Sequence, residues 1–264
     1  MCYSAGISAC EKGGQWQQAL SLLTQARGSV LELDVVSYSA VISACEKGCQ
    51  WQQALSLLRE LCAARLQPDV ASYNAAISAC EKGRQWEQAL SLLGEAEARV
   101  GASIFSYNAG MSACEKGGQW QRALSIFGDM REAEVEPNVM SYSAGISACE
   151  KRSQWQQALA LFRGMCEDVL DPDDISYCAV ISACDRGGQW PHALSLPGDL
   201  RSTRFELKVI RQCQSWSRRL RETRGVEGSL LFTVAIARFE VVLDFDLQTS
   251  PEVHGDSWTT SRGF

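Results

Sequence analysis

Hydrophobic and polar positions recur along this chain in blocks of about 35 residues. Each block has one tyrosine near its start and one tryptophan near its middle. The tyrosines stand at positions 3, 38, 73, 107, 142 and 177, and the tryptophans at positions 16, 51, 86, 120, 155 and 190. A fixed period of this size is the signature of a solenoid, in which each unit packs against its neighbours.

Within one block the apolar residues predict two helices. In block 35–69 the first helical face consists of Tyr38, Val41, Ile42 and Cys45. The second helical face consists of Trp51, Ala54, Leu55, Leu58 and Leu61. Gly48 is expected to end the first helix, and Pro68 lies where the chain turns into the next block. Each block is therefore predicted to be an antiparallel helix pair.

The repeats define the expected domain organisation. Residues 1–200 are predicted to form an all-α solenoid of about six helix-turn-helix units, and residues 201–264 a non-repeat tail. The expected units are 1–34, 35–69, 70–103, 104–138, 139–173 and a degenerate 174–200. The tyrosine, tryptophan and leucine positions are predicted to be core, and a binding role for the tryptophans is the alternative.

Small polar residues recur at two further places in the unit. The residues that follow the tyrosines are Ser4, Ser39, Asn74, Asn108, Ser143 and Cys178. The last residues of the units are Asp34, Asp69, Ser103, Asn138, Asp173 and Lys208. Restricted polar variation beside a constant core suggests a modular recognition surface. A local role, with Asp or Asn as the N-cap of the next helix, is the competing interpretation.

The pattern resembles the pentatricopeptide repeat, in its plain 35-residue class. The resemblance rests on the period, the Tyr-Asn or Tyr-Ser start, the fixed Ala-Leu pair and block ends such as Glu136-Pro137-Asn138, and it covers roughly residues 1–200. It implies a right-handed superhelical α-solenoid that binds single-stranded RNA, one base per unit.

The resemblance also implies which residues read each base. The implied pairs are Ser4 with Asp34, Ser39 with Asp69, Asn74 with Ser103, Asn108 with Asn138, and Ser143 with Asp173. In this family, Ser with Asp favours G, Asn with Ser favours C, and Asn with Asn favours a pyrimidine. The implied ligand is about 5′-GGCYG-3′.

Apolar residues at the second place of each unit resemble those that sandwich bases in the family. They are Met1, Val36, Ala71, Phe105 and Met140, of which Ala71 is small. The sixth unit departs from the pattern, because Cys178 and Lys208 fit no known pairing. Pro191 and Pro197 also interrupt its second helix. This unit is predicted to be a degenerate cap.

The net charge of the repeats argues against nucleic-acid binding. Residues 1–200 carry 15 basic and 23 acidic residues, whereas nucleic-acid binders are usually basic. This balance favours the alternative function, a protein-interaction scaffold similar to tetratricopeptide arrays. The 35-residue period and the Pro-Asp block ends favour the RNA-binding interpretation.

The chain has 12 cysteines, and six of them occupy one repeated position. Equivalent positions on stacked helices are about 8–10 Å apart, too far for a disulfide, so these residues are predicted to be buried thiols in a reducing compartment. No secretory signal or membrane-spanning run is expected in this chain. The resemblance implies a chloroplast or mitochondrial protein.

No catalytic constellation is found, so the chain is expected to lack enzyme activity, metals and cofactors. His192 and His254 have no matching ligand cluster. In the tail, residues 201–224 suggest a basic helix or a solvated charged segment, and residues 239–247 alternate like a strand. Because Met1 enters a unit at its second place, the chain is also expected to be a fragment.

Overall fold

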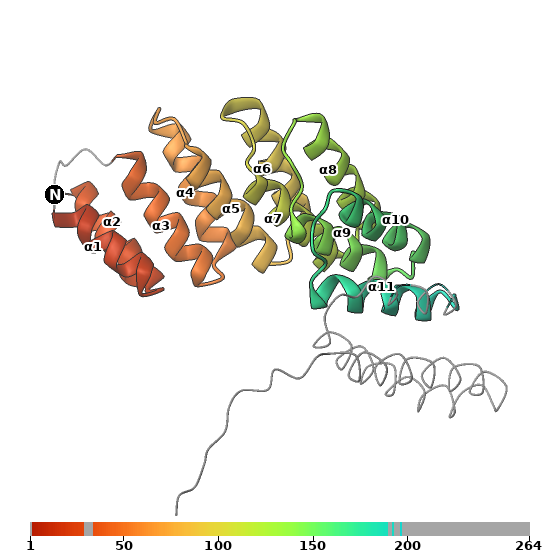
Figure 1. Ribbon diagram of the computed structural model, residues 1–264. Coiled ribbons are helices and arrows are strands. Elements are labelled where there is room, and N and C mark those ends of the chain that lie inside the picture. The colour runs from red at the N-terminus through yellow and green to blue at the C-terminus, as the bar shows by residue number, and fades with distance from the viewer. Residues whose placement is uncertain (1, 29–33, 190–191, 193–195, 197–264) are drawn as a thin grey trace, which may run out of the picture. The chain divides into compact units, whose positions relative to one another are not determined.

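A computed structural model describes residues 2–28, 34–189, 192 and 196 of the protein (Figure 1). The chain divides into two compact units, Met1–Ala193 and Leu194–Phe264. The second unit lies almost wholly outside the described residues, as do the helix and strand expected in the tail. The first unit consists of α-helices, with no strand in its described part.

Eleven helices follow one another in the described part of the chain. They are α1 (Cys2–Lys12), α2 (Trp16–Gly28), α3 (Val35–Lys47), α4 (Trp51–Ala63), α5 (Val70–Lys82), α6 (Trp86–Arg99), α7 (Ile104–Gly117), α8 (Trp120–Glu132), α9 (Val139–Lys151), α10 (Trp155–Glu167) and α11 (Asp174–Arg186). The predicted pairing of helices is confirmed, and each second helix begins at its tryptophan. None of these helices is long and apolar enough to cross a membrane.

The helices form two layers within the first unit. The odd-numbered helices pack in sequence, α1 on α3, α3 on α5, and so on to α11 (Figure 1). Each even-numbered helix from α2 to α10 packs against the odd helix of its own pair and against the next odd helix. One pair therefore leaves apolar surface open that only the following pair can cover.

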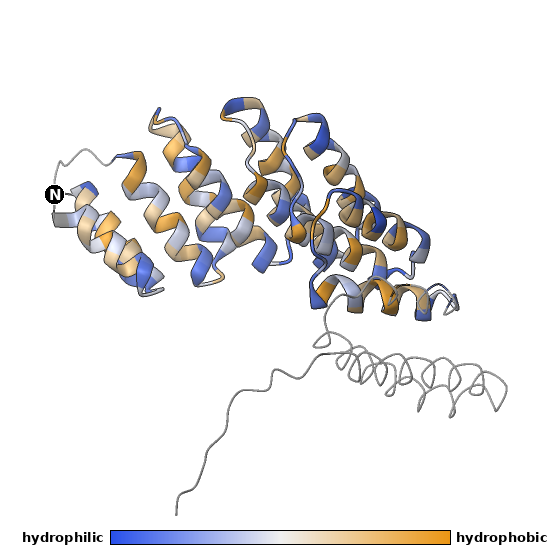
Figure 2. Cartoon of the chain, in the orientation of Figure 1, coloured by the Kyte–Doolittle hydropathy of each residue, from blue (hydrophilic) through white to orange (hydrophobic). Residues whose placement is uncertain are grey.

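The core lies between these layers, as the apolar periodicity predicts. Tyr73, Tyr107 and Tyr142 are almost completely buried, and the alanine series fits where helices cross closely, since Ala54 and Ala89 have no exposed surface. The five tryptophans among the described residues differ from the prediction, because they are half-buried and lie at the edge of the core. Figure 2 shows hydrophobic and hydrophilic residues on different sides of the helices.

In the turns between paired helices, the residue with left-handed backbone comes one place after the glycine that the sequence suggests. Gly48 follows α3 as predicted, but its φ is −80°. The next residue, Cys49, has φ 56°, and Arg84 and Ser153 match it in their own turns. Backbone conformation therefore does not explain why glycine stands at the end of the first helix.

Candidate nucleic-acid interface

The structure brings the two proposed base-reading residues of a unit into contact. From α3 onwards, the residue after the tyrosine is the fifth residue of an odd helix, and the last residue of the unit caps the next odd helix. Their side chains join across the helices: Ser39 to Asp69 (3.1 Å), Ser103 to Asn74 (3.1 Å), Asn108 to Asn138 (3.3 Å) and Ser143 to Asp173 (3.2 Å). Ser4 occupies the equivalent place on α1 and is half-buried.

The local capping role expected for the last residues is also present. Asp34, Asp69, Ser103, Asn138 and Asp173 each accept a hydrogen bond from the backbone N–H three residues later. An N-cap of this kind satisfies one of the free N–H groups at a helix start. Because the capping hydrogen bond holds each of these side chains at the helix start, the orientation of its other polar atoms is also restricted.

A serine that the sequence analysis overlooked connects the two residues of each pair. It precedes the tyrosine of the following unit, and its hydroxyl contacts the polar side chain of the preceding odd helix: Ser72 with Ser39 (2.6 Å), Ser106 with Asn74 (2.5 Å), Ser141 with Asn108 (2.6 Å) and Ser176 with Ser143 (2.7 Å). Its recurrence at 37, 72, 106, 141 and 176 was the available signal.

Units with Ser and Asp present a hydrogen-bond acceptor. Asp69 Oδ1 accepts from the Ser72 N–H (2.8 Å) and the Ser72 hydroxyl (2.6 Å). No described residue binds Asp69 Oδ2. Burial raises the pKa of Asp69, but hydrogen bonds from Ser72 and Ser39 outweigh it and hold the pKa below its usual value. Hydrogen bonds from Ser37 likewise lower the pKa of Asp34. Both carboxylates are therefore ionised acceptors at neutral pH.

Units with Asn present a donor instead. Asn74 Oδ1 accepts from the hydroxyls of Ser103 and Ser106, and in the described part of the chain nothing accepts from the amide nitrogen of Asn74. Asn108 Oδ1 accepts from Ser141, and one N–H of Asn108 is donated to Asn138. The polar groups that these pairs leave available therefore differ between units, with an acceptor in the Ser–Asp units and a donor in the Asn-containing units.

Exposed apolar side chains stand beside these polar pairs. Val36, Phe105 and Met140 are 63%, 69% and 64% exposed, which is unusual for large hydrophobic residues in this protein. Ile175, at the same place in the sixth unit, is 61% exposed and was not among the predicted contacts. The polar residues Ser39, Asn108 and Ser143 are far less exposed, at 9%, 9% and 8%. A planar ligand could insert between the apolar side chains and meet the polar pair below.

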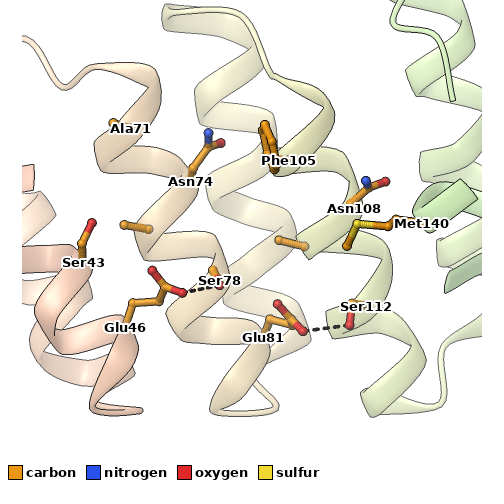
Figure 3. A pocket seen from close by; sticks show the side chains of 12 residues that line it. Ser43, Glu46, Ala71, Asn74, Ser78, Glu81, Phe105, Asn108, Ser112 and Met140 are labelled. Atoms are coloured by element: carbon orange, nitrogen blue, oxygen red, sulfur yellow. Dashed lines mark hydrogen bonds between the residues drawn. The ribbon is translucent and has the colours of Figure 1, made fainter. Parts of the chain in front are cut away.

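Phe105 and Met140 border a cavity of about 500 Å³ over α5 and α7 (Figure 3). Asn74 and Asn108 also line it, as does the small Ala71 of α5. Glu46 and Glu81 line the same cavity, and each accepts a hydrogen bond from a serine of the next odd helix, Ser78 (2.9 Å) and Ser112 (2.8 Å) respectively.

A row of ion pairs follows the far ends of the odd helices. Each glutamate pairs with the basic residue one unit later: Glu11–Lys47 (3.3 Å), Glu46–Lys82 (2.9 Å), Glu81–Lys116 (2.7 Å), Glu115–Lys151 (2.9 Å) and Glu150–Arg186 (3.2 Å). Five of the acidic residues are thus paired with a basic residue along these helix ends.

These features define a class of protein, a stacked helical-pair solenoid with a repeated polar pair on its odd helices. The PPR repeat family model matches residues 71–99, and a second PPR repeat family model matches residues 33–82 and 102–151. The chain therefore contains pentatricopeptide repeats, which these models match over residues 33–99 and 102–151. A search of curated proteins found no match.

Solved structures share the fold. Maize PPR10 in complex with an 18-nucleotide psaJ RNA element is 20% identical, with a TM-score of 0.65 over 93% of this chain and 33% of PPR10. The PPR domain of Arabidopsis thaliana protein-only RNase P 1 in complex with tRNA is 16% identical, with a TM-score of 0.60 over 71% of this chain and 96% of that domain. The chain therefore spans about a third of the length of PPR10.

Proposed function

We propose that this chain binds single-stranded RNA sequence-selectively, with one nucleotide at each unit. The observation that carries the proposal is the repeated arrangement in which a paired polar contact lies below exposed apolar side chains. Stacking of a base on an aromatic side chain contributes about 1–3 kcal/mol, and the polar groups below would select the base edge. The RNA complexes of the structurally similar PPR10 and RNase P domain support this function.

The polarity of each pair supports a particular sequence. The ionised Asp69 acceptor suits guanine, whose pairing edge carries N–H donors. The outward amide of Asn74 suits a base edge with acceptors, such as that of cytosine. Reading the units in order gives about 5′-GGCYG-3′, from Ser4/Asp34 to Ser143/Asp173. Val36, Phe105 and Met140 would flank the bases.

Phosphate contacts would fall on the lysines of the ion pairs between units. Lys47, Lys82, Lys116 and Lys151 recur at the ends of the odd helices, with side chains 35–43% exposed. They have glutamate partners, so their attraction for phosphate is moderated. We expect weaker salt dependence than for a basic nucleic-acid binder.

A binding titration tests the proposal. An RNA that contains GGCCG within an unstructured adenine-rich strand should bind at micromolar affinity or tighter, and a strand with the same bases scrambled should bind more weakly. Replacing the Asn74/Ser103 pair by Asn74→Ser with Ser103→Asp should shift the third preference from C to G. Equal affinity for both strands would refute base selection.

The proposed biological role rests on the family resemblance and is less specific than the proposed base preference. We propose that the protein acts in RNA processing, stability or translation in a chloroplast or mitochondrion. Cell fractionation followed by sequencing of co-purified RNA tests this role. If the protein's partners persist after ribonuclease treatment and no RNA is enriched, a protein-interaction scaffold becomes the better description.

A further inference from the structure

One buried serine accompanies each of the four polar pairs from Ser39/Asp69 to Ser143/Asp173. Ser72, Ser106, Ser141 and Ser176 are at most 1% exposed, so they cannot meet a ligand directly. Each lies in the first turn of an odd helix, and each hydroxyl bonds both to that helix's own N-cap residue and to the polar residue of the preceding odd helix. A serine needed only for capping would not require the second contact.

The second contact determines which way an asparagine amide faces. The two ends of an amide have nearly the same shape, so the hydrogen-bond partners decide between them. Ser106 donates to Asn74 Oδ1 at 2.5 Å, and Ser103 donates to the same oxygen at 3.1 Å. With its oxygen held inward, Asn74 offers N–H donors outward. Ser141 holds Asn108 Oδ1 in the same way at 2.6 Å.

We infer that, where a unit reads its base with an asparagine, the serine preceding the next tyrosine is a positioning residue that sets the base preference of that unit, an inference that rests on the proposed function. Ser106 therefore acts on the nucleotide met by Asn74 and Ser103, and Ser141 on the nucleotide met by Asn108 and Asn138. Base preference then depends on three residues from two units.

The two kinds of pair respond differently to loss of this serine. A carboxylate has two acceptor oxygens, so Asp69 still presents an acceptor when the hydroxyl of Ser72 is removed. An amide has one acceptor and one donor end, so Asn74 becomes able to turn over when the hydroxyl of Ser106 is removed. The structure thus predicts that the serines of Asn-containing pairs affect selectivity more than those of Ser–Asp pairs.

The experiment compares RNAs that differ at one nucleotide. Affinities of the whole chain are measured for the GGCCG strand and for strands with each other base at position three or position four. The variants are Ser106→Ala, Ser141→Ala and Ser72→Ala. Ser112→Ala is the matched control, because it removes another hydroxyl from α7 whose 2.8 Å hydrogen bond is to Glu81, away from the polar pairs.

We expect Ser106→Ala to lower discrimination at position three by about fivefold, the effect of one lost hydrogen bond, and to leave position four unchanged. Ser141→Ala should do the reverse, and Ser72→Ala and Ser112→Ala should leave the preference for the correct base at every position. A purely structural role would weaken binding to all strands equally. Circular dichroism shows whether each variant folds. If Ser106→Ala does not fold, the inference is tested with Ser141→Ala alone.

The outcomes separate the two proposals. A selective wild-type chain whose Ser106→Ala and Ser141→Ala variants keep full discrimination overturns this inference and leaves the proposed function standing. A wild-type chain that does not discriminate at position three overturns base selection, and the inference falls with it. A shift of the relaxed position from three to four between the two variants supports both.

Discussion

Trp51 lies directly against Gly83, the residue that ends the first helix of the following unit. A Cβ atom on Gly83 would lie 2.7 Å from Trp51 Cγ, closer than carbon atoms pack. The same contact joins Trp16 to Gly48, Trp86 to Gly117 and Trp155 to Gly187. Since Gly83 has φ −77°, any residue could adopt its backbone, and the contact with tryptophan explains the glycine.

Gly83→Ala should therefore destabilise the protein. Overpacking of this kind typically costs about 1–3 kcal/mol, because the indole ring or the helix end must shift. Urea unfolding followed by circular dichroism measures the change. Gly94→Ala is the matched control, since a Cβ there meets nothing within 4 Å. It lies within α6, where the change should stabilise by about 0.5–1 kcal/mol. Equal effects of the two variants would show that the Trp51 contact is unimportant.

Val169→Gly should stabilise the protein. Val169 has φ 58° and is 89% exposed, so it bears the strain of a left-handed backbone without burying its side chain. Relief of this strain is worth about 1–2 kcal/mol, partly offset by the greater freedom of glycine when unfolded. Ala64→Gly, at φ −72° in an earlier turn, should destabilise instead. A fall in the urea midpoint of Val169→Gly would contradict the strain argument.

Cys62→Arg should give Tyr73 a hydrogen-bond partner. The equivalent tyrosines Tyr38 and Tyr142 accept from Arg27 (3.3 Å) and Arg131 (2.6 Å), whereas the buried Tyr73 hydroxyl has no partner in the described part of the chain. Cys62 occupies the place of the arginine. A new hydrogen bond should raise the free energy of unfolding by about 1 kcal/mol. Cys62→Leu adds bulk without a donor, and an equal gain there would refute the explanation.

Buried thiols make stability and reactivity depend on pH. Burial raises the pKa of Cys45, Cys80, Cys114, Cys149 and Cys184 to about 11, from an ordinary value of 9.0. A folded pKa above the unfolded one stabilises the fold fully below pH 9, and this contribution is lost as pH rises towards 11.

A thiol reagent at pH 8 should accordingly modify the exposed Cys49 quickly and these five cysteines only after unfolding. Mass spectrometry of labelled peptides gives the order of reaction. Rapid native-state labelling of Cys80 would contradict the burial of this row, and a flat stability profile between pH 9 and 11 would contradict the raised pKa values.

The sequence predicted features that lie within one unit. Apolar spacing gave the helix pairs, the tyrosine and alanine core positions, and the N-cap at the last residue, because each depends on helical geometry over a few residues. The row of buried, free cysteines also followed from the repeat, and only Cys10, at the start of the array, is partly open.

Contacts between units were not predictable in this way. The Glu46–Lys82 pair, the Ser106–Asn74 hydrogen bond and the Trp51–Gly83 contact all depend on how far one helix pair is offset along the next. Periodicity shows that a position recurs but not which position it faces. For the same reason the tryptophans were assigned to the core, although they cover the edge of it.

The ion pairs between units have a consequence for how such an array grows. Each glutamate of the row from Glu11 to Glu150 binds the lysine or arginine one unit further on, so a unit of the row offers an acid forwards and a base backwards. A copy of a unit inserted by tandem duplication would therefore match both of its new neighbours at once. Such an array can lengthen without evolving any new contact surface between its units.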